Sequence, residues 1–279
     1  MRKIAPGVYL ETKYLGIHLG ALASGGETLL VDTPVRLEDG HRWLEDVTAL
    51  GRPRFLVLLD HHPDRALGAR GLDLPLVAHD VSGDRIGAWQ DTFKGDAHPM
   101  GAEADRLKRA TGVRRAIPEL TFSQTIRLHV GEMEVELVHR PGPTPGSIWA
   151  VVPKAKVVFV GDCIWVGEPP YLGEADIPSW LEALAELRGK RWRGYRIISS
   201  RNGLVQGPAI HAMLRTLRRL RGGMRRLGSG RPLSDEAVAA LAAQLARPFR
   251  LPPGRKARAL QRLQSGLVDF QRRAGEGGG

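Results

Sequence analysis

The chain has 279 residues, enough for one large hydrophobic core or two modest ones, and its hydrophobic share of 42% and charged share of 25% are ordinary for a globular protein. No apolar run approaches the roughly 20 residues that cross a membrane, and the single cysteine, Cys163, excludes an intramolecular disulfide and a metal site built from several cysteines. The net charge of +11 belongs to residues 206–279, which hold 14 Arg and 1 Lys against 2 Asp and 2 Glu.

The N-terminal residues contain no apolar signal-peptide core. We therefore expect a cytoplasmic location and no membrane attachment.

The first part of the chain predicts short strands followed by a strand–helix–strand unit. Short apolar runs between turn residues predict strands at 7–10, 19–23 and 28–31, and the apolar spacing over 37–50 predicts a helix that ends at Gly51. A strand at 55–59 follows, so a βαβ crossover is expected here.

The middle of the chain predicts a short strand, two helices and then a series of strands. We expect a strand at 76–78 and helices at 84–93 and 102–111. Regularly spaced strands are expected at 122–128, 132–139, 148–152 and 157–160. A helix over 177–187 begins after the capping residue Asp176, and a last strand covers 195–199.

Residues 206–279 predict two or three helices. An apolar stripe runs through Ile210, Met213, Leu217 and Leu220, and a second helix starts at Ser234. A third follows the break at 252–253. We expect this basic extension to pack on the rest of the chain or on a second subunit, in a homodimer.

Ionisable residues crowd the end of the strand at 55–59. Asp60, His61, His62, Asp64 and Arg65 lie within six positions, where α/β proteins often place their chemistry. Imidazole and carboxylate groups suit zinc, iron or manganese. A solvated loop rich in Asp and His is the alternative interpretation of this segment taken alone.

The segment resembles the signature of the metallo-β-lactamase superfamily, His-x-His-x-Asp-His followed by Gly. Aligned on Gly68, His62 and Asp64 match, whereas Asp60 and Arg65 stand where that family has His. The opening strand at 4–10, the strand and turn at 29–33 and the Gly161–Asp162 strand end resemble the same family, over residues 4–205. The resemblance implies an α/β (α+β) fold, a four-layer αββα sandwich over residues 1–205, with residues 206–279 as a helical C-terminal extension.

The resemblance also implies seven positions that hold two metal ions. The first metal's positions are Asp60, His62 and Pro143; those of the second are Asp64, Arg65 and Asn202; and Asp162 is the position that bridges both. Three of the seven keep the family residue, and every loss is a loss of His. Asp60 and Asn202 still offer oxygen, but Pro143 cannot coordinate a metal.

Arg65 is the most telling change, because it puts a permanent cation where the family holds a dication. Its guanidinium can bind Asp64 and Asp162 by forked hydrogen bonds and replace the charge of the metal. Without any cation, Asp60, Asp64 and Asp162 would repel one another and take up protons.

Three interpretations of the site follow. In the first, the chain descends from metal-dependent hydrolases but has lost the dinuclear site, with lost or altered activity. In the second, one Fe, Mn or Zn ion is bound by Asp60, His62, Asp64 and Asp162, with Asp64 as the catalytic candidate for hydrolysis of a small ester, thioester or amide. In the third, His61 or His139 replaces a missing ligand.

A non-catalytic role is the competing class of function. The old pocket would bind a small anion near Arg65, or the Arg-rich C-terminal helices would bind nucleic acid. Trp165 and Tyr171 closely follow Asp162 and are candidates for one wall of the pocket, or for core packing.

Overall fold

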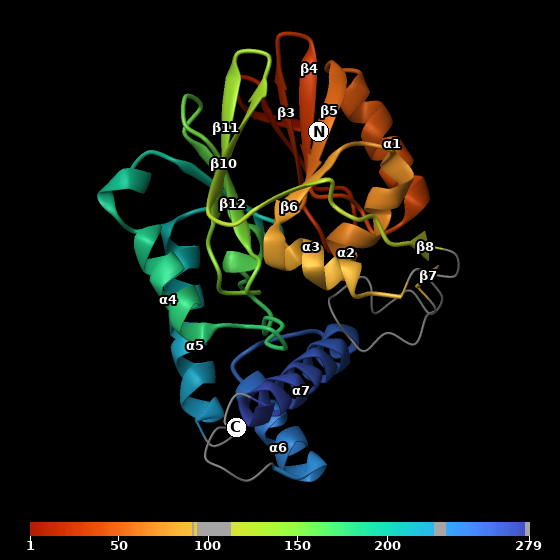
Figure 1. Cartoon of the computed structure of the whole chain (residues 1–279). Helices are drawn as coiled ribbons and strands as arrows, with labels where there is room; N and C mark the ends of the chain where they lie inside the picture. The colour runs from red at the N-terminus through yellow and green to blue at the C-terminus, as the bar shows by residue number, and fades with distance from the viewer. Residues whose placement is uncertain (91, 94–112, 226–232, 277–279) are drawn as a thin grey trace.

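Two facing β-sheets form the centre of the protein, with helices on both outer sides (Figure 1). The structure is a computed structural model and describes residues 1–90, 92–93, 113–225 and 233–276. The helix expected at 102–111 lies outside the described residues.

The first sheet has the strand order β1-β2-β3-β4-β5-β6-β9. Its strands are β1 (Arg2–Ala5), β2 (Val8–Glu11), β3 (Leu19–Ser24), β4 (Glu27–Val31), β5 (Arg52–Val57), β6 (Leu76–His79) and β9 (Leu120–Phe122). The pairs among β1 to β4 are antiparallel, and β4, β5, β6 and β9 pair in parallel. The carboxyl ends of β4 and β5 therefore lie at the same edge of this sheet.

The second sheet has the order β10-β11-β12-β13-β14-β15. Its strands are β10 (Thr125–Val130), β11 (Met133–His139), β12 (Ile148–Val152), β13 (Val157–Phe159), β14 (Arg196–Ser199) and β15 (Gly203–Val205). Its one parallel pair is β13 with β14, so the carboxyl ends of these two strands also lie side by side.

Helices α1 (Leu37–Thr48) and α3 (Asp80–Gly87) cover the first sheet, and α4 (Ile177–Glu186) and α5 (Gly207–Met224) cover the second. An apolar layer between the sheets includes Leu29, Val57 and Phe159. Trp43 of α1 and Ile86 of α3 pack with residues of the first sheet in a further apolar layer. This is the expected four-layer αββα arrangement.

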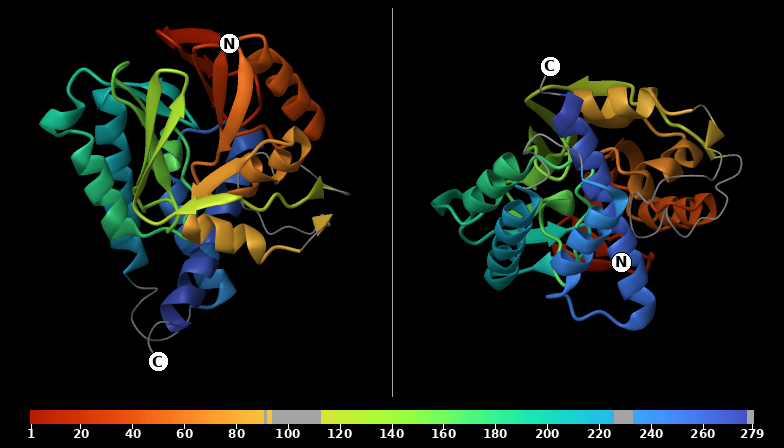
Figure 2. Two further views of the ribbon diagram at one scale, coloured as in Figure 1. Left: turned by 45° about the horizontal axis from the view of Figure 1, so that its top comes forward. Right: turned by 90° about the horizontal axis from the view of Figure 1, so that it is seen from below.

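The C-terminal helices α6 (Asp235–Ala246) and α7 (Pro253–Glu276) lie across one end of the sandwich (Figure 2, right). The Ser234 side chain caps α6 by accepting the Ala237 N–H. Leu263 and Leu267 of α7 are fully buried in the same apolar cluster as Trp180 of α4. The extension therefore shares a hydrophobic core with the sandwich. Among the described helices, none is long and apolar enough to cross a membrane.

The remaining short elements include α2 (Pro63–Ala66), η1 (Leu67–Leu72), β7 (Thr92–Phe93), β8 (Val113–Arg114), η3 (Gly161–Cys163) and η4 (Lys190–Trp192). The expected strand at 122–128 is two strands, because the chain turns between β9 and β10 and passes from one sheet to the other. The helix expected at 84–93 is instead α3, which begins earlier because His79 caps it by accepting the Val81 N–H.

Candidate functional site

Charged side chains from four strand ends meet in the interior at one edge of the sandwich. The loop after β4 brings Asp32, the segment after β5 brings residues 60–65, the turn after β13 brings Asp162, and the loop after β14 brings Arg201. Carboxyl ends of parallel strands commonly carry the functional groups of α/β proteins. We call the following residues the buried cluster: Asp32, Asp60, His62, Asp64, Arg65, Asp162, Ser200 and Arg201.

Arg65 lies at the centre of the buried cluster and is completely buried. Its Nη1 atom lies 3.0 Å from Asp32 Oδ2, its Nε atom lies 3.0 Å from Asp60 Oδ1, and its Nη2 atom pairs with Asp162. Asp64, which we expected as a partner, is not among these contacts. Asp64 and Arg65 are consecutive residues of α2, and neighbouring positions of a helix do not face each other.

Arg201 supplies the second buried guanidinium. It makes a forked contact with Asp162, with Nε 2.8 Å from Oδ1 and Nη2 2.8 Å from Oδ2. It also pairs with both carboxylate oxygens of Asp64, and its Nη1 atom donates to the Gly16 carbonyl at 3.0 Å. Asp162 therefore contacts two guanidinium groups at once.

His62 lies between two carboxylates. Its Nδ1 atom is 3.2 Å from both Asp60 Oδ1 and Asp162 Oδ2. Burial lowers the pKa of His62, but the two carboxylates outweigh that effect and raise the pKa to about 10. The imidazole is therefore charged at neutral pH in this arrangement.

The three cations also set the protonation of the carboxylates. Burial raises the pKa of Asp60, but Arg65 and His62 outweigh it and lower that pKa to about 2. The pKa of Asp162 is well below its usual range, since Arg201 and Arg65 outweigh burial. Burial dominates at Asp32 and raises its pKa to about 6.

The residues do not fit a dinuclear metal centre. Two guanidinium groups already bind the carboxylates that such a centre would need, and guanidinium stays protonated and cannot act as a ligand. Pro143 is buried in its loop, and the Asn202 side chain bonds to the backbone N–H and carbonyl of Val166.

A smaller ligand set remains. Asp60, His62 and Asp162 each present one ligand atom, and these atoms lie within 4.8 Å of one another, so this triad could hold a single metal ion. Asp60 Oδ2 and His62 Nε2 are buried and make no hydrogen bond to the described residues.

The alternative histidines have other partners. His61 Nε2 lies 2.9 Å from Glu174 Oε1, and His139 Nε2 lies 2.8 Å from the Pro145 carbonyl. The His139 ring also stacks on His79, with centroids 3.8 Å apart. Neither His61 nor His139 contributes an atom to the triad.

Trp165 and Tyr171 both lie beside the buried cluster. The Tyr171 ring meets the His62 ring edge to face, with centroids 5.7 Å apart, and its hydroxyl donates to Asp269 of α7 at 3.0 Å. Trp165 lies between two guanidinium groups, with Arg201 4.6 Å and Arg262 of α7 4.5 Å from its ring centre. Helix α7 therefore closes this side of the cluster.

The sequence alone did not identify Asp32, Ser200 and Arg201 as members of the buried cluster. Asp32 falls in the expected strand and turn at 29–33; its Oδ1 atom accepts the Leu59 N–H at 2.9 Å and its Oδ2 atom accepts the Ser200 hydroxyl at 3.1 Å. Arg201 directly precedes Asn202, the aligned metal position. The signal that could have found it is charge balance, because one guanidinium cannot neutralise several buried carboxylates.

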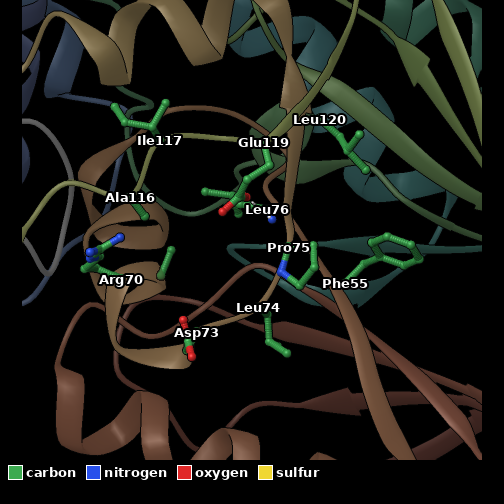
Figure 3. A pocket seen from close by; sticks show the side chains of 11 residues that line it. Phe55, Arg70, Asp73, Leu74, Pro75, Leu76, Ala116, Ile117, Glu119 and Leu120 are labelled. Atoms are coloured by element: carbon green, nitrogen blue, oxygen red, sulfur yellow. Dashed lines mark hydrogen bonds between the residues drawn. The ribbon is translucent and has the colours of Figure 1, made fainter.

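Two described cavities differ in their relation to the cluster. The larger, about 590 Å³, lies on the first sheet's side and is lined by apolar residues including Phe55 and Ile117, with Arg70, Asp73 and Glu119 (Figure 3). None of its lining residues belongs to the buried cluster. The smaller, about 280 Å³, includes Trp165 and Arg201 in its wall.

Similar folds occur among solved structures. A metallo-β-lactamase from Pontibacter korlensis has 16% identity and a TM-score of 0.60, covering 78% of this chain and 97% of that chain. The metallo-β-lactamase family protein TTHA1429 from Thermus thermophilus has 17% identity and a TM-score of 0.66, covering 98% of this chain and 95% of its own. The DIM-1 metallo-β-lactamase exposed to ceftazidime has 15% identity and a TM-score of 0.57, and the match covers 78% of this chain and 100% of that chain.

These similarities show a shared fold, and the TTHA1429 match includes the C-terminal helices because it spans nearly the whole chain. No curated protein matches the sequence. The family model for the metallo-β-lactamase superfamily matches residues 20–197, which is more than half of the chain. The chain therefore belongs to the metallo-β-lactamase superfamily.

Proposed function

We propose that this protein has lost the dinuclear, metal-dependent hydrolysis typical of its superfamily and keeps the site as a metal-free ion-pair network. The observation that carries this proposal is the environment of Asp162, the bridging position. Both Arg65 and Arg201 bind its carboxylate, and among the described residues no further His joins the triad of Asp60, His62 and Asp162.

The ion pairs already present in the buried cluster support the proposal. The buried cluster contains four carboxylates, and two guanidiniums and one imidazole face them. The two dications of a dinuclear centre would have to take Asp64 and Asp162 from Arg65 and Arg201, and a displaced guanidinium would then have no carboxylate partner in the protein interior. A buried charge without a partner costs several kcal/mol, roughly 3–5 by analogy with broken buried pairs.

The first test is the metal content of the purified protein, measured by elemental mass spectrometry after growth with added zinc, manganese and iron. The expected result is well below one metal ion per chain and a melting temperature that a chelator leaves unchanged. A stoichiometric metal that the chelator removes, with loss of stability, would overturn the proposal.

Back-substitution gives a matched comparison. Restoring the four histidines alone leaves Arg201 bound to Asp64 and Asp162, so this variant should not take up two metals. A second variant also removes the Arg201 side chain from Asp64 and Asp162, and it should take up two metal ions. It combines Asp60→His, Arg65→His, Pro143→His, Asn202→His and Arg201→Gly. Equal metal uptake by both variants would show that Arg201 does not occupy a metal position.

A mononuclear hydrolase is the second candidate, and the triad of Asp60, His62 and Asp162 favours it. One Fe, Mn or Zn ion there would supply an activated water for a small ester, thioester or amide. Binding of one metal per chain that Asp162→Asn abolishes, together with hydrolysis, would select this candidate over the first.

The anion-binding alternative does not gain support at Arg65. That side chain is fully buried, and each of its three nitrogen atoms is paired with a carboxylate. Because the guanidinium already faces three carboxylates, an added anion would have to displace one of them.

A further inference from the structure

A small cavity lies outside the buried cluster, where the C-terminal extension meets the sandwich. It measures about 280 Å³, and its wall includes Trp165 and Glu168 from the loop after η3, Arg201 from the loop after β14, and Arg250 and Arg255 from the extension. Gly16, from the loop between β2 and β3, also lines it, so four segments that are distant in sequence border one space.

The cavity carries uncompensated positive charge. Arg250 is exposed and has no carboxylate partner among the described residues. Arg255 uses only Nε, which lies 3.2 Å from Glu168 Oε1, so its two Nη groups remain available as donors. The other oxygen of Glu168 lies 3.3 Å from Arg262, so this single carboxylate is divided between two guanidiniums.

Arg201 contributes shape to the cavity but no free donor. Its nitrogen atoms bind Asp64, Asp162 and the Gly16 carbonyl. The binding groups of the cavity are therefore the two arginines of the extension, and the cavity shares only Arg201 with the buried cluster. The inference below does not depend on whether the cluster holds a metal.

The start of α7 adds to the attraction for an anion. Pro252 and Pro253 precede its first free N–H, that of Gly254, and a side chain at Gly254 would have no neighbour within 4 Å. The N-terminal end of a helix favours negative charge. The helix end supports the two arginines and is not needed as a site by itself.

We propose that this cavity binds a small phosphate monoester. Guanidinium groups match the tetrahedral oxygens of phosphate in a forked arrangement, and two of them suit a dianion. The volume is close to the lower limit of ordinary small-molecule sites, about 300 Å³. Glu168 can accept a hydrogen bond from a hydroxyl on the ester's organic part.

The surroundings of Trp165 narrow the ligand further. Arg201 and Arg262 both stack on its ring, at 4.6 Å and 4.5 Å from the centroid. Trp165 is also only 5% exposed, so its ring offers little surface to a nucleobase, and the ligand is a compact aliphatic ester such as a sugar or polyol phosphate.

The test is isothermal titration of the full-length protein with glycerol 1-phosphate, inorganic phosphate and a single-stranded oligonucleotide. The proposal expects saturable binding of one glycerol 1-phosphate per chain, tighter than binding of inorganic phosphate. The double variant Arg250→Gln/Arg255→Gln should weaken it by about tenfold or more, since it removes the charge-assisted hydrogen bonds of both guanidiniums to the phosphate.

The control removes the same charge elsewhere. Arg218 and Arg219 are exposed on α5 and do not line the cavity, so Arg218→Gln/Arg219→Gln should change the affinity less than about twofold. Circular dichroism and melting temperature check that both double variants fold. Absence of saturable monoester binding, equal weakening by both double variants, or tighter binding of inorganic phosphate than of the ester would each overturn the proposal. Oligonucleotide binding that both variants weaken equally, without monoester binding, would instead indicate a general polyanion surface.

Discussion

Arg65 contacts three carboxylates that come from three different loops, so a change at this one residue affects the whole buried cluster. We expect Arg65→Met, which keeps much of the side-chain volume, to lower the free energy of unfolding by about 3–5 kcal/mol, because it leaves buried carboxylates without a partner. Urea denaturation at pH 7 measures this. The exposed control Arg218→Met should stay within about 0.5 kcal/mol of the parent protein. A loss below about 1 kcal/mol for Arg65→Met would contradict the prediction.

His62 predicts a distinctive dependence of stability on pH. Its pKa in the folded protein is about 10, above the ordinary value of 6.5, because Asp60 and Asp162 outweigh burial. The proton on His62 therefore stabilises the fold fully below pH 6.5, and this contribution is lost as the pH rises towards 10.

The measurement compares His62→Gln with the parent protein by urea denaturation at pH 6, 8 and 10. We expect a loss of the order of 3 kcal/mol at pH 6 that shrinks at the higher values. The exposed control His129→Gln on β10 should show no such trend. A loss that grows with pH would mean that neutral His62 is the important form, as in a metal ligand.

At the scale of single residues, the sequence allowed five of the eight residues of the buried cluster to be anticipated. Asp60, His62, Asp64 and Arg65 lie within one short segment, and a familiar strand end marks Asp162, so local pattern was sufficient for them. Arg201 and Asp32 could not be identified in the same way, because their role depends on which loops meet in space. The catalytic role of Asp64 and the metal-binding roles of Asp60, His62 and Asp162 stay predictions.

Helix α7 depends on one close approach to the loop that walls the cluster. A Cβ atom at Gly266 would lie 2.9 Å from the backbone nitrogen of Leu172, whereas one at Gly254 of the same helix would meet nothing within 4 Å. Gly266→Ala should therefore lower the free energy of unfolding by about 1–3 kcal/mol, because the backbone has to move.

Gly254→Ala is the matched control within α7. It should be neutral or stabilise the protein by up to about 1 kcal/mol, as alanine is the better helix former. Urea denaturation of both variants separates the two effects. Equal changes at the two positions would mean that α7 does not pack closely on the loop.

At the scale of elements, the sandwich strands were easier to predict than the connections. Periodic apolar spacing marks α1, β11 and α5, because each buries one face on a sheet. The sequence pattern did not predict that β9 and β10 are separate strands, since apolar residues recur through both of them. Only the turn between them decides which sheet each strand joins. The strand β15 was also missed, because it has only three residues.

The molecule as a whole should unfold as a single unit. One apolar cluster joins α4 and β14 of the sandwich with α5, α6 and α7. All six tryptophans lie within residues 1–205, so their fluorescence reports mainly on the sandwich, with Trp165 also in contact with Arg262 of α7. We expect fluorescence and the helical signal at far-ultraviolet wavelengths to follow the same denaturation curve. Loss of helical signal at lower urea concentration than the fluorescence change would show that residues 206–279 form an independent domain.

The binding of Asp162 by two arginines at once has a consequence for how this protein can evolve. Because Arg65 and Arg201 share one carboxylate, losing either arginine alone leaves the other carboxylates unbalanced, and regaining any one histidine brings no complete metal site. Each single step back towards a metalloenzyme is therefore expected to be harmful, although the completed path need not be. Substitutions at independent surface positions have additive effects, whereas substitutions within this cluster depend on one another. A return to a metal site would therefore require several substitutions at the same time.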